Sequence, residues 1–539
     1  MTLKYLKPTI KAEPLIWNWY AWSYLIPPIT AGCNIAERYL KIMQSYVQNP
    51  IVHAQAAKDP KMLGGPFVDL GGKRVEEIKE LIANTKKVCV DLISLNDSYK
   101  ELDQILQTET QGDSIEGLYS RIPKVLKGLV ELVYDLNNHP SIRIIEPLVY
   151  SKYYSYSAKE QKIALSDTVS DYRTFVINTP RLDQEHEVYL ACPFSDSRLD
   201  ILFNMRYEPR DLSEIKDLLQ IPESKQSIFD SFFTDTPPSI LPDRNYTGEG
   251  VRLRYFGHAC VLIETKSISI LFDPMISYPI NTKEAQKVLR YTFVDLPDSI
   301  DYVILTHNHQ DHILFETLLQ LRHKIKNIVF PVSAFGTLQD PSIKLILKHI
   351  GFTCNLIELK EMDSMHLPNE TRAIITGLPF FGEHSDLNIQ SKMAYSIKLK
   401  NHHLLFAADS NNLDASLYDH IFDHIGPVDM LFLGMECDGA PLTCLYGPLL
   451  TKSLKRSYDN NRTLSGSNFE KAWSIAEKSN CKEAYVYAMG QEPWLSYITS
   501  LEYTPESLQI IESNRFIEAC TTKGIKAERP FGRKEWVLE

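Results

Sequence analysis

The order of hydrophobic and polar positions gives the two halves of the chain different characters. In the first half, apolar residues recur at helical spacing over residues 75–106 and again over residues 123–136. A shorter run at 174–177 has the β-branched and aromatic content of a strand. The pattern predicts a mixed α+β domain over residues 1–245, and we identify no catalytic motif in it.

Short apolar runs separated by turn residues dominate the second half. Runs at 251–255 and 260–264 flank Gly257-His258 and predict paired strands, and a run at 267–272 predicts a third strand that ends at Asp273. Helical spacing returns over the stretches that follow some of these strands. The half therefore predicts an α/β domain, with further strands at residues 302–305, 327–331, 395–399, 404–407, 429–433 and 484–488, and helices at 313–321 and 469–477.

A polar segment over residues 221–250 separates the halves. It contains Pro237-Pro238, Gly248 and Gly250, and such clusters are typical of connecting segments. A chain of 539 residues is also too long for one hydrophobic core. We therefore predict two domains, 1–245 and 246–539.

Composition narrows the range of partners and compartments. The net charge of −11 argues against a general nucleic-acid binder. No stretch approaches the roughly twenty apolar residues of a membrane span. The nine cysteines are scattered without a Cys-x-x-Cys pair, which favours free thiols in a reducing compartment. We expect a cytoplasmic protein with neither a nucleic-acid nor a membrane partner.

The densest group of metal-binding side chains lies in Thr306-His-Asn-His-Gln-Asp-His312, between a predicted strand and a predicted helix. His307 and His309 are two residues apart and can point the same way from an extended segment. Asp311 and His312 lie beyond the turn and can reach a second ion. Neutral imidazoles with a carboxylate suit zinc or iron. This stretch, which we call the metal turn, predicts a dinuclear site.

The sequence after the metal turn offers some, but not all, of the further ligands that a dinuclear site needs. Asp409 follows the predicted strand 404–407, and a carboxylate there can bridge two cations and reduce their repulsion. No histidine follows His424, so an imidazole ligand near the C-terminus is absent or replaced. Glu383 and His384 would point to opposite faces of an extended segment, so only one is expected to bind. His384 would suit a zinc hydrolase, and Glu383 an oxygen-activating iron site, because hard oxygen ligands suit iron.

The motif His-x-His-x-Asp-His after a strand resembles the signature of the metallo-β-lactamase superfamily. That resemblance implies an αββα sandwich with the metals at one edge of two packed sheets. The superfamily commonly has an Asp beneath the metal turn, and Asp273 in that place would orient a ligand histidine. The fold does not fix the reaction.

A narrower resemblance favours Glu383. The Glu383-His384 pair follows His312 by 71 residues (383 − 312), and Asp409 comes 26 residues later (409 − 383). With the metal turn, Gly434-Met-Glu-Cys-Asp-Gly-Ala-Pro and Tyr487-Ala-Met-Gly-Gln-Glu-Pro-Trp, this arrangement is similar to the diiron β-hydroxylase family known from chloramphenicol biosynthesis. The absence of a late histidine fits that family.

The resemblance implies a reaction and a ligand set. Such enzymes are monooxygenases that use O₂, two irons and an external electron donor. They hydroxylate the β-carbon of an amino acid tethered as a thioester to the carrier domain of a non-ribosomal peptide synthetase. The N-terminal domain would support a homodimer and dock the carrier. The implied ligands are His307, His309 and Glu383 on one iron, Asp311 and His312 on the other, and Asp409 shared, with Glu383 and Asp409 central to catalysis.

Two questions stay open at the level of sequence. Glu436 and Asp438 follow the predicted strand 429–433, and either could receive the ammonium group of a substrate or simply be a solvated turn residue. The alternative function is a zinc-dependent hydrolase of a phosphodiester or acyl substrate, with His384 as a ligand.

Overall fold

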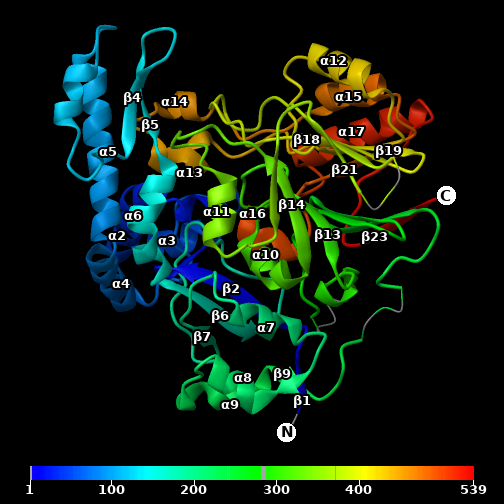
Figure 1. Cartoon of the computed structure of the whole chain (residues 1–539), viewed down its shortest axis with the longest axis horizontal. Coiled ribbons are helices and arrows are strands. Elements are labelled where there is room, and N and C mark those ends of the chain that lie inside the picture. Colours follow the sequence, from blue (N-terminus) through cyan, green and yellow to red (C-terminus); the bar gives the residue numbers. More distant parts are fainter. Residues whose placement is uncertain (1–2, 240, 242, 281–286, 369, 371) are drawn as a thin grey trace.

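The C-terminal half is a sandwich of two seven-stranded sheets (Figure 1). The computed structural model describes residues 3–239, 241, 243–280, 287–368, 370 and 372–539. In spatial order, the first sheet consists of β15 (Asn355–Leu359), β14 (Ile325–Pro331), β13 (Ile300–Ile304), β12 (Ser269–Phe272), β11 (Cys260–Glu264), β10 (Val251–Gly257) and β23 (Lys534–Leu538). The second consists of β16 (Ser364–His366), β17 (Ile374–Leu378), β18 (Ala394–Leu399), β19 (His402–Phe406), β20 (Met430–Gly434), β21 (Glu483–Tyr487) and β22 (Lys526–Glu528).

Apolar side chains from both sheets form one buried cluster between them. Phe272 of the first sheet stacks on Phe406 of the second at 4.1 Å between ring centroids, and Phe406 stacks on Phe432. Strands β12 to β15 are parallel to one another, as are β19 to β21. Parallel strands bring their carboxyl ends to one edge of a sheet, which is where α/β folds build ligand sites.

Helices cover the outer face of each sheet, which confirms the predicted αββα sandwich. Helices α12 (Ser416–Ile425), α15 (Phe469–Ser479) and α17 (Leu508–Thr522) pack on the second sheet (Figure 1). Helices α10 (Phe315–Leu321) and α11 (Ile343–His349) share an apolar cluster with the first sheet. The short helices α13 (Leu442–Tyr446), α14 (Arg456–Asp459) and α16 (Ser496–Thr499) lie in the loops.

The N-terminal half is a separate α+β domain that packs on the first sheet through the same cluster. One of its sheets has the order β3 (Trp19–Tyr20), β2 (Ile10–Ile16), β6 (Gln161–Asp167), β7 (Val188–Leu190), and another has β8 (Arg210–Asp211), β1 (Leu3–Leu6), β9 (Phe233–Thr234). Its helices are α1 (Pro28–Asn34), α2 (Leu40–Gln48), α3 (Pro50–Ala56), α4 (Val75–Val88), α5 (Val90–Glu109), α6 (Glu146–Ala158), α7 (Arg198–Asn204), α8 (Leu212–Leu218) and α9 (Glu223–Ser231).

Two local predictions in this domain are wrong. The helix expected over residues 123–136 is a turn followed by strand β4 (Val130–Tyr134), which pairs with β5 (Pro140–Ile144). The β-branched valines of this segment favour a strand. Val130 and Leu132 are buried and the residue between them is less so, which is the alternation of a strand. The strand expected at 174–177 is irregular, because its backbone bonds elsewhere: Val176 donates to the carbonyl of Tyr497 at 2.9 Å.

The predicted connector over residues 221–250 is partly folded. Helix α9 and strand β9 occupy its first part, so the chain remains in the N-terminal domain to Thr234. Residues 240 and 242 of the segment lie outside the described part of the chain.

Buried ion pairs join the two halves. Glu13 of β2 is 1% exposed and accepts hydrogen bonds from Arg173 and Arg181. Arg173 also donates to Glu316 of α10 at 2.8 Å, and Tyr20 donates to the same carboxylate. The N-terminal domain is therefore anchored to the helix that follows the metal turn.

Replacing Glu13 by alanine is expected to destabilise the protein by about 1–3 kcal/mol, because Arg173 and Arg181 lose the buried carboxylate that they share and keep only Glu316 and Glu187. Burial opposes the charge of Glu13, but Arg181, Lys11 and Arg173 hold its pKa below the ordinary value. The stabilisation is thus present at neutral pH and is lost as pH falls through the folded-state pKa. Thermal unfolding at several pH values measures this. Glu76→Ala, which removes an exposed pair with Lys79, is the control and should leave stability unchanged.

Candidate metal centre

The candidate ligands leave neighbouring strands at one edge of the sandwich. Asp273 follows β12, the metal turn follows β13, and Asp409 follows β19. The backbone N–H of Asp273 donates to Ile304 of β13 at 2.9 Å, which keeps the first two strand ends together. The second sheet contributes in the same way, since Gly434 at the end of β20 donates to Ala408. Both sheets therefore deliver side chains to one point.

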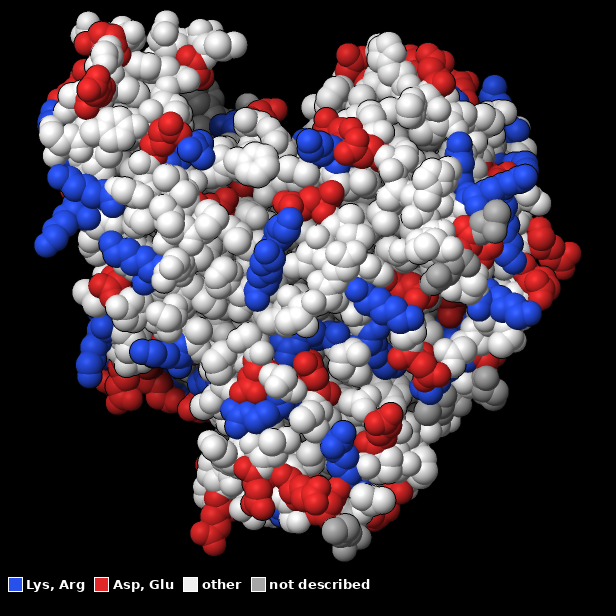
Figure 2. All heavy atoms as spheres, viewed as in Figure 1, with Lys and Arg blue, Asp and Glu red and all other residues white. Residues whose placement is uncertain are grey.

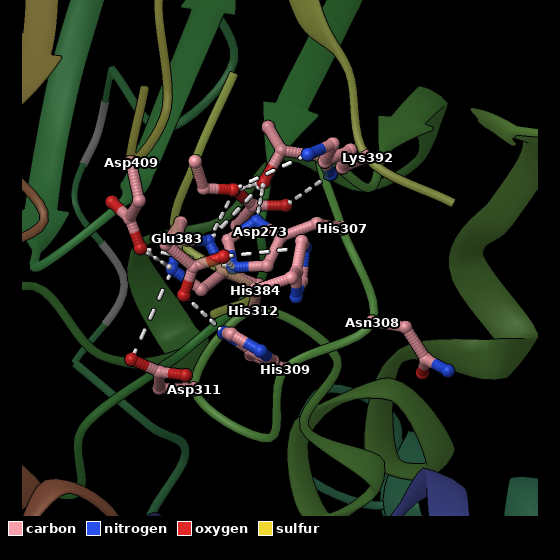
Figure 3. A network of polar contacts seen from close by, with 12 residues as sticks. Asp273, His307, Asn308, His309, Asp311, His312, Glu383, His384, Lys392 and Asp409 are labelled. Atoms are coloured by element: carbon pink, nitrogen blue, oxygen red, sulfur yellow. Dashed lines mark hydrogen bonds and ion pairs between the residues drawn. The ribbon is translucent and has the colours of Figure 1, made fainter. Parts of the chain in front are cut away.

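All six predicted ligands converge at this edge (Figure 3). Among the described residues, three groups could hold a cation, and within each group one ligand atom per residue lies within 4.8 Å of the others. Two groups share His307 and two share His312, so the three form one continuous centre. The groups are His307, His309 and Glu383; His307, His312 and Asp409; and His258, Asp311 and His312.

Asp409 lies between the two halves of this centre. Its Oδ2 is 3.1 Å from His312 Nε2 and 3.7 Å from His307 Nε2. Glu383 Oε2 lies 3.6 Å from His307 Nε2, and its Oε1 contacts His309 Nδ1. The carboxylate of Asp409 is thus within reach of the imidazoles of both halves of the centre.

Among the described residues, several buried polar atoms in the centre have no hydrogen-bond partner. These atoms are His258 Nε2, His307 Nε2, Glu383 Oε2, His384 Nε2 and Asp409 Oδ1. Leaving such groups buried and unsatisfied is costly, so their convergence indicates a site built for cations. Burial and the neighbouring imidazoles hold the pKa of His307 well below its ordinary value, which keeps it in the neutral form that metals bind. A donor set of imidazoles and carboxylates, without cysteine, fits iron.

Asp273 holds His312 and Thr306 of the metal turn by hydrogen bonds. It accepts a hydrogen bond from His312 Nδ1 at 2.8 Å and two more from the backbone and hydroxyl of Thr306. The ring proton of His312 is therefore on Nδ1, and Nε2 is left free to bind a metal.

The predicted geometry of Glu383 and His384 is wrong. The segment is not extended, because Glu383 has a φ of 65° and Ser385 and Asp386 also adopt the left-handed conformation. This tight turn brings both side chains toward the centre. Glu383 joins the group with His307 and His309, whereas His384 belongs to none of the three groups and its Nδ1 lies 2.9 Å from Tyr446 Oη. Tyr446 also contacts His309 Nε2 at 3.0 Å.

Comparison with known proteins places this centre in a family. A curated relative, the 4-amino-L-phenylalanyl-[CmlP-peptidyl-carrier-protein] 3-hydroxylase of Streptomyces venezuelae, is 35% identical over 527 residues, which cover 97% of this chain and 98% of the relative. The profile of the diiron non-heme beta-hydroxylase N-terminal domain matches residues 5–237, and that of the beta-lactamase superfamily domain matches residues 269–440. The chain belongs to the diiron β-hydroxylase family.

The fold of this β-hydroxylase agrees with that assignment throughout. The crystal structure of CmlA, a diiron beta-hydroxylase from Streptomyces venezuelae, superposes with a TM-score of 0.91 at 33% identity and covers 100% of both chains. A metal-dependent hydrolase of Anoxybacillus flavithermus is 28% identical over 137 residues, 24% of this chain and 56% of that protein. Among the described residues, no helix is long and apolar enough to cross a membrane.

His258, which the sequence places only in a turn between two predicted strands, contacts the centre of the β-hydroxylase. His258 Nε2 lies 3.2 Å from Asp311 Oδ2. The backbone N–H of Gly490 donates to His258 Nδ1 at 3.1 Å, so a neutral ring carries its proton on Nε2. The Nε2–H then faces Asp311 across this ion-pair distance, without the geometry of a hydrogen bond among the described residues. The sequence predicts that Gly257-His258 connects two strands, but it carries no signal that this turn lies next to the metal turn.

Changing His258 to leucine is expected to weaken metal binding on the Asp311 side by about 10- to 100-fold, the usual effect of removing the partner that orients a ligand. Glutamine can place an amide N–H near the position of Nε2, so His258→Gln should recover part of the affinity. Metal titration of the two variants, read by the spectrum of the bound metal, measures the difference. Equal loss in both variants would contradict a role for the contact between His258 and Asp311.

The two carboxylates that follow β20 differ in their exposure to solvent. Glu436 is half-buried and lies two residues beyond Gly434, whose Cβ position would come within 2.6 Å of Asp409 Oδ1. Asp438 is exposed. Of the two, Glu436 is therefore the one that follows the strand end at the metal centre more closely.

Proposed function

We propose that this β-hydroxylase inserts one oxygen atom from O₂ into the β-C–H bond of an amino acid that is held as a thioester on the carrier domain of a non-ribosomal peptide synthetase. The observation that carries the proposal is the place of Glu383, which joins His307 and His309 while His384 remains outside the ligand groups. The printed activity of the Streptomyces venezuelae relative, on an aminoacyl residue of a peptidyl carrier protein, supports the substrate class.

In this proposal six side chains hold two irons. When bound, the iron pair supplies the redox chemistry that activates O₂, and electrons come from an external donor. Burial and the neighbouring imidazoles lower the pKa of His307 and favour its neutral form, and Asp273 orients His312. Tyr446 fixes the rings of His309 and His384. The first iron would be held by His307, His309 and Glu383, the second by Asp311 and His312, and both by Asp409.

We assign the N-terminal domain, residues 1–245, to homodimer formation and to docking of the carrier. Its contact with the centre supports an influence on the reaction, because Ser23 donates to the carbonyl of Asn308 in the metal turn at 3.3 Å. Arg38 donates to the carbonyls of Cys444 and Leu445, next to Tyr446. On the face in Figure 2, acidic and basic side chains are interspersed.

Mass spectrometry of carrier-bound products tests the proposed function. Iron-loaded enzyme, a chemical reductant and ¹⁸O₂ are mixed with carrier domains that bear different amino acids. We expect one of them to gain a single ¹⁸O atom at the β-carbon. Hydrolysis of an ester or phosphodiester by the zinc form, with no oxygen incorporation into any aminoacyl carrier, would overturn the proposal and favour the hydrolase.

A further inference from the structure

A cavity of about 910 Å³ lies between the two halves of the enzyme. One wall comes from the N-terminal domain, over residues 57–69 and 171–179, and the other from the loop after β21, over residues 491–505. Its volume is at the upper end of the range for small-molecule sites. None of the predicted metal ligands lines this cavity.

The inner end of the cavity adjoins the metal centre. Glu492 in its wall accepts a hydrogen bond from Tyr255 at 2.7 Å and lies against Gly257, the neighbour of His258. The hydroxyl of Tyr503, another wall residue, is buried without a partner among the described residues. Gln509 of α17 donates to the carbonyl of Asp438 at 2.9 Å, and the next residue, Ile510, lines the cavity, so the loop that carries Glu436 lies against its wall.

The outer end is open and apolar. Met62, Leu63, Tyr172 and Phe531 line it, and each is a large side chain left substantially exposed, from 38% for Leu63 to 71% for Tyr172. The cavity therefore connects a hydrophobic opening with a polar inner end. By contrast, the side chains of Asp409 and Asp311 are only 12% and 20% exposed. A substrate attached to a macromolecule can reach them only on a long, narrow linker.

We propose that this cavity binds the pantetheine arm of an aminoacylated carrier and that Glu436 accepts the α-ammonium group of the amino acid at its inner end. This inference rests on the proposed function and adds the path and the recognition of the substrate. The arm is a flexible chain of amides and methylenes, which suits a cavity with mixed polar and apolar walls.

The place of Glu436 explains how the β-carbon would be presented. β19 and β20 are parallel neighbours, and Gly434 at the end of β20 packs against Asp409 at the end of β19. Glu436, two residues further on, has no hydrogen bond or ion pair through its carboxylate among the described residues. An ammonium group held there is one bond from the α-carbon. The β-carbon, two bonds from that nitrogen, would then lie near the end of β20, beside the strand end that carries Asp409.

Recognition of the ammonium group is tested with two synthetic ligands. Both are aminoacyl-pantetheine mimics with an amide in place of the thioester, and one carries a hydroxyl in place of the α-amine. With the iron-loaded enzyme we expect the amine to bind more tightly. Glu436→Gln should reduce this preference by roughly 10- to 100-fold, as expected for the loss of a charged hydrogen bond. Asp438→Asn, at an exposed position in the same loop, is the control and should keep the preference.

The assigned path of the pantetheine arm is tested by blocking the outer end of the cavity with a large side chain. Thr504 is an exposed wall residue, and Thr522 is an exposed threonine at the far end of α17. Thr504→Trp should weaken binding of the amine mimic at least about tenfold, with iron content unchanged, and Thr522→Trp should not. Equal binding by both tryptophan variants would overturn the assigned path, and an unchanged preference in Glu436→Gln would overturn the assigned recognition.

These outcomes are separate from a failure of the proposed function. If the wild-type enzyme hydroxylates a carrier-bound amino acid while the Thr504 and Glu436 variants behave like wild type, only the cavity assignment fails. If the wild-type enzyme hydroxylates no aminoacyl carrier and binds neither mimic, the proposed function fails with it.

Discussion

Replacing Asp409 by alanine is expected to abolish β-hydroxylation and to empty most of the metal centre. Its Oδ2 lies within 3.7 Å of both His307 Nε2 and His312 Nε2, so one carboxylate serves both halves of the centre. Without that anion, the repulsion between two bound cations is no longer offset. The loss of metal affinity should exceed the roughly 10- to 100-fold loss that follows removal of a ligand's hydrogen-bond partner. Metal analysis after gel filtration measures it.

Asp423→Ala provides the matched control, because Asp423 is an exposed carboxylate on α12. It should keep the iron content and the activity of the wild type. An Asp409→Ala variant that retains a full complement of iron and turns over would contradict the shared position of this carboxylate. Far-UV circular dichroism confirms that each variant is folded.

Changing Glu383 to histidine is expected to convert the centre into one that binds zinc and no longer supports O₂ chemistry. Glu383 places a carboxylate among the imidazoles of His307 and His309. The substitution removes an anionic oxygen ligand, which stabilises the higher oxidation states of iron, and adds an imidazole that zinc accepts equally well. We expect β-hydroxylation to fall by at least about a thousandfold, while some metal is retained.

His384→Gln is the neighbouring control for that change. His384 contacts Tyr446 and lies outside the three ligand groups, so its loss should reduce activity far less than the loss of Glu383. The zinc-hydrolase alternative predicts the opposite order. An enzyme that keeps β-hydroxylation as Glu383→His, or loses all its metal as His384→Gln, would show that the ligand at this place has been misassigned.

The sequence predicts the sandwich well because its strands are short, apolar and separated by turns. The metal turn, Asp273 and Asp409 could also be placed, since each follows a strand whose end is fixed by the sheet. The spacing of apolar residues gave a wrong prediction where the same positions suit both a helix and a strand, as in the hairpin of β4 and β5. There the β-branched residues decided the conformation.

Contacts between distant segments could not be predicted. His258 reaches Asp311 only because the turn after β10 meets the loop after β21, where Gly490 donates to its ring. The left-handed φ of 65° at Glu383 depends on its surroundings rather than on a glycine at that position, so spacing alone suggested an extended segment. The cavity likewise exists only where two domains meet, and no local pattern reports it.

The most direct test of the central claim is the Mössbauer spectrum of the protein loaded with iron-57, together with its metal content. The account predicts two irons per chain in one exchange-coupled cluster, as the diiron family requires. It also predicts that the coupled signal disappears in the Asp409→Ala variant. Isolated, uncoupled iron, or a protein that binds zinc and cannot be loaded with iron under anaerobic conditions, would contradict it.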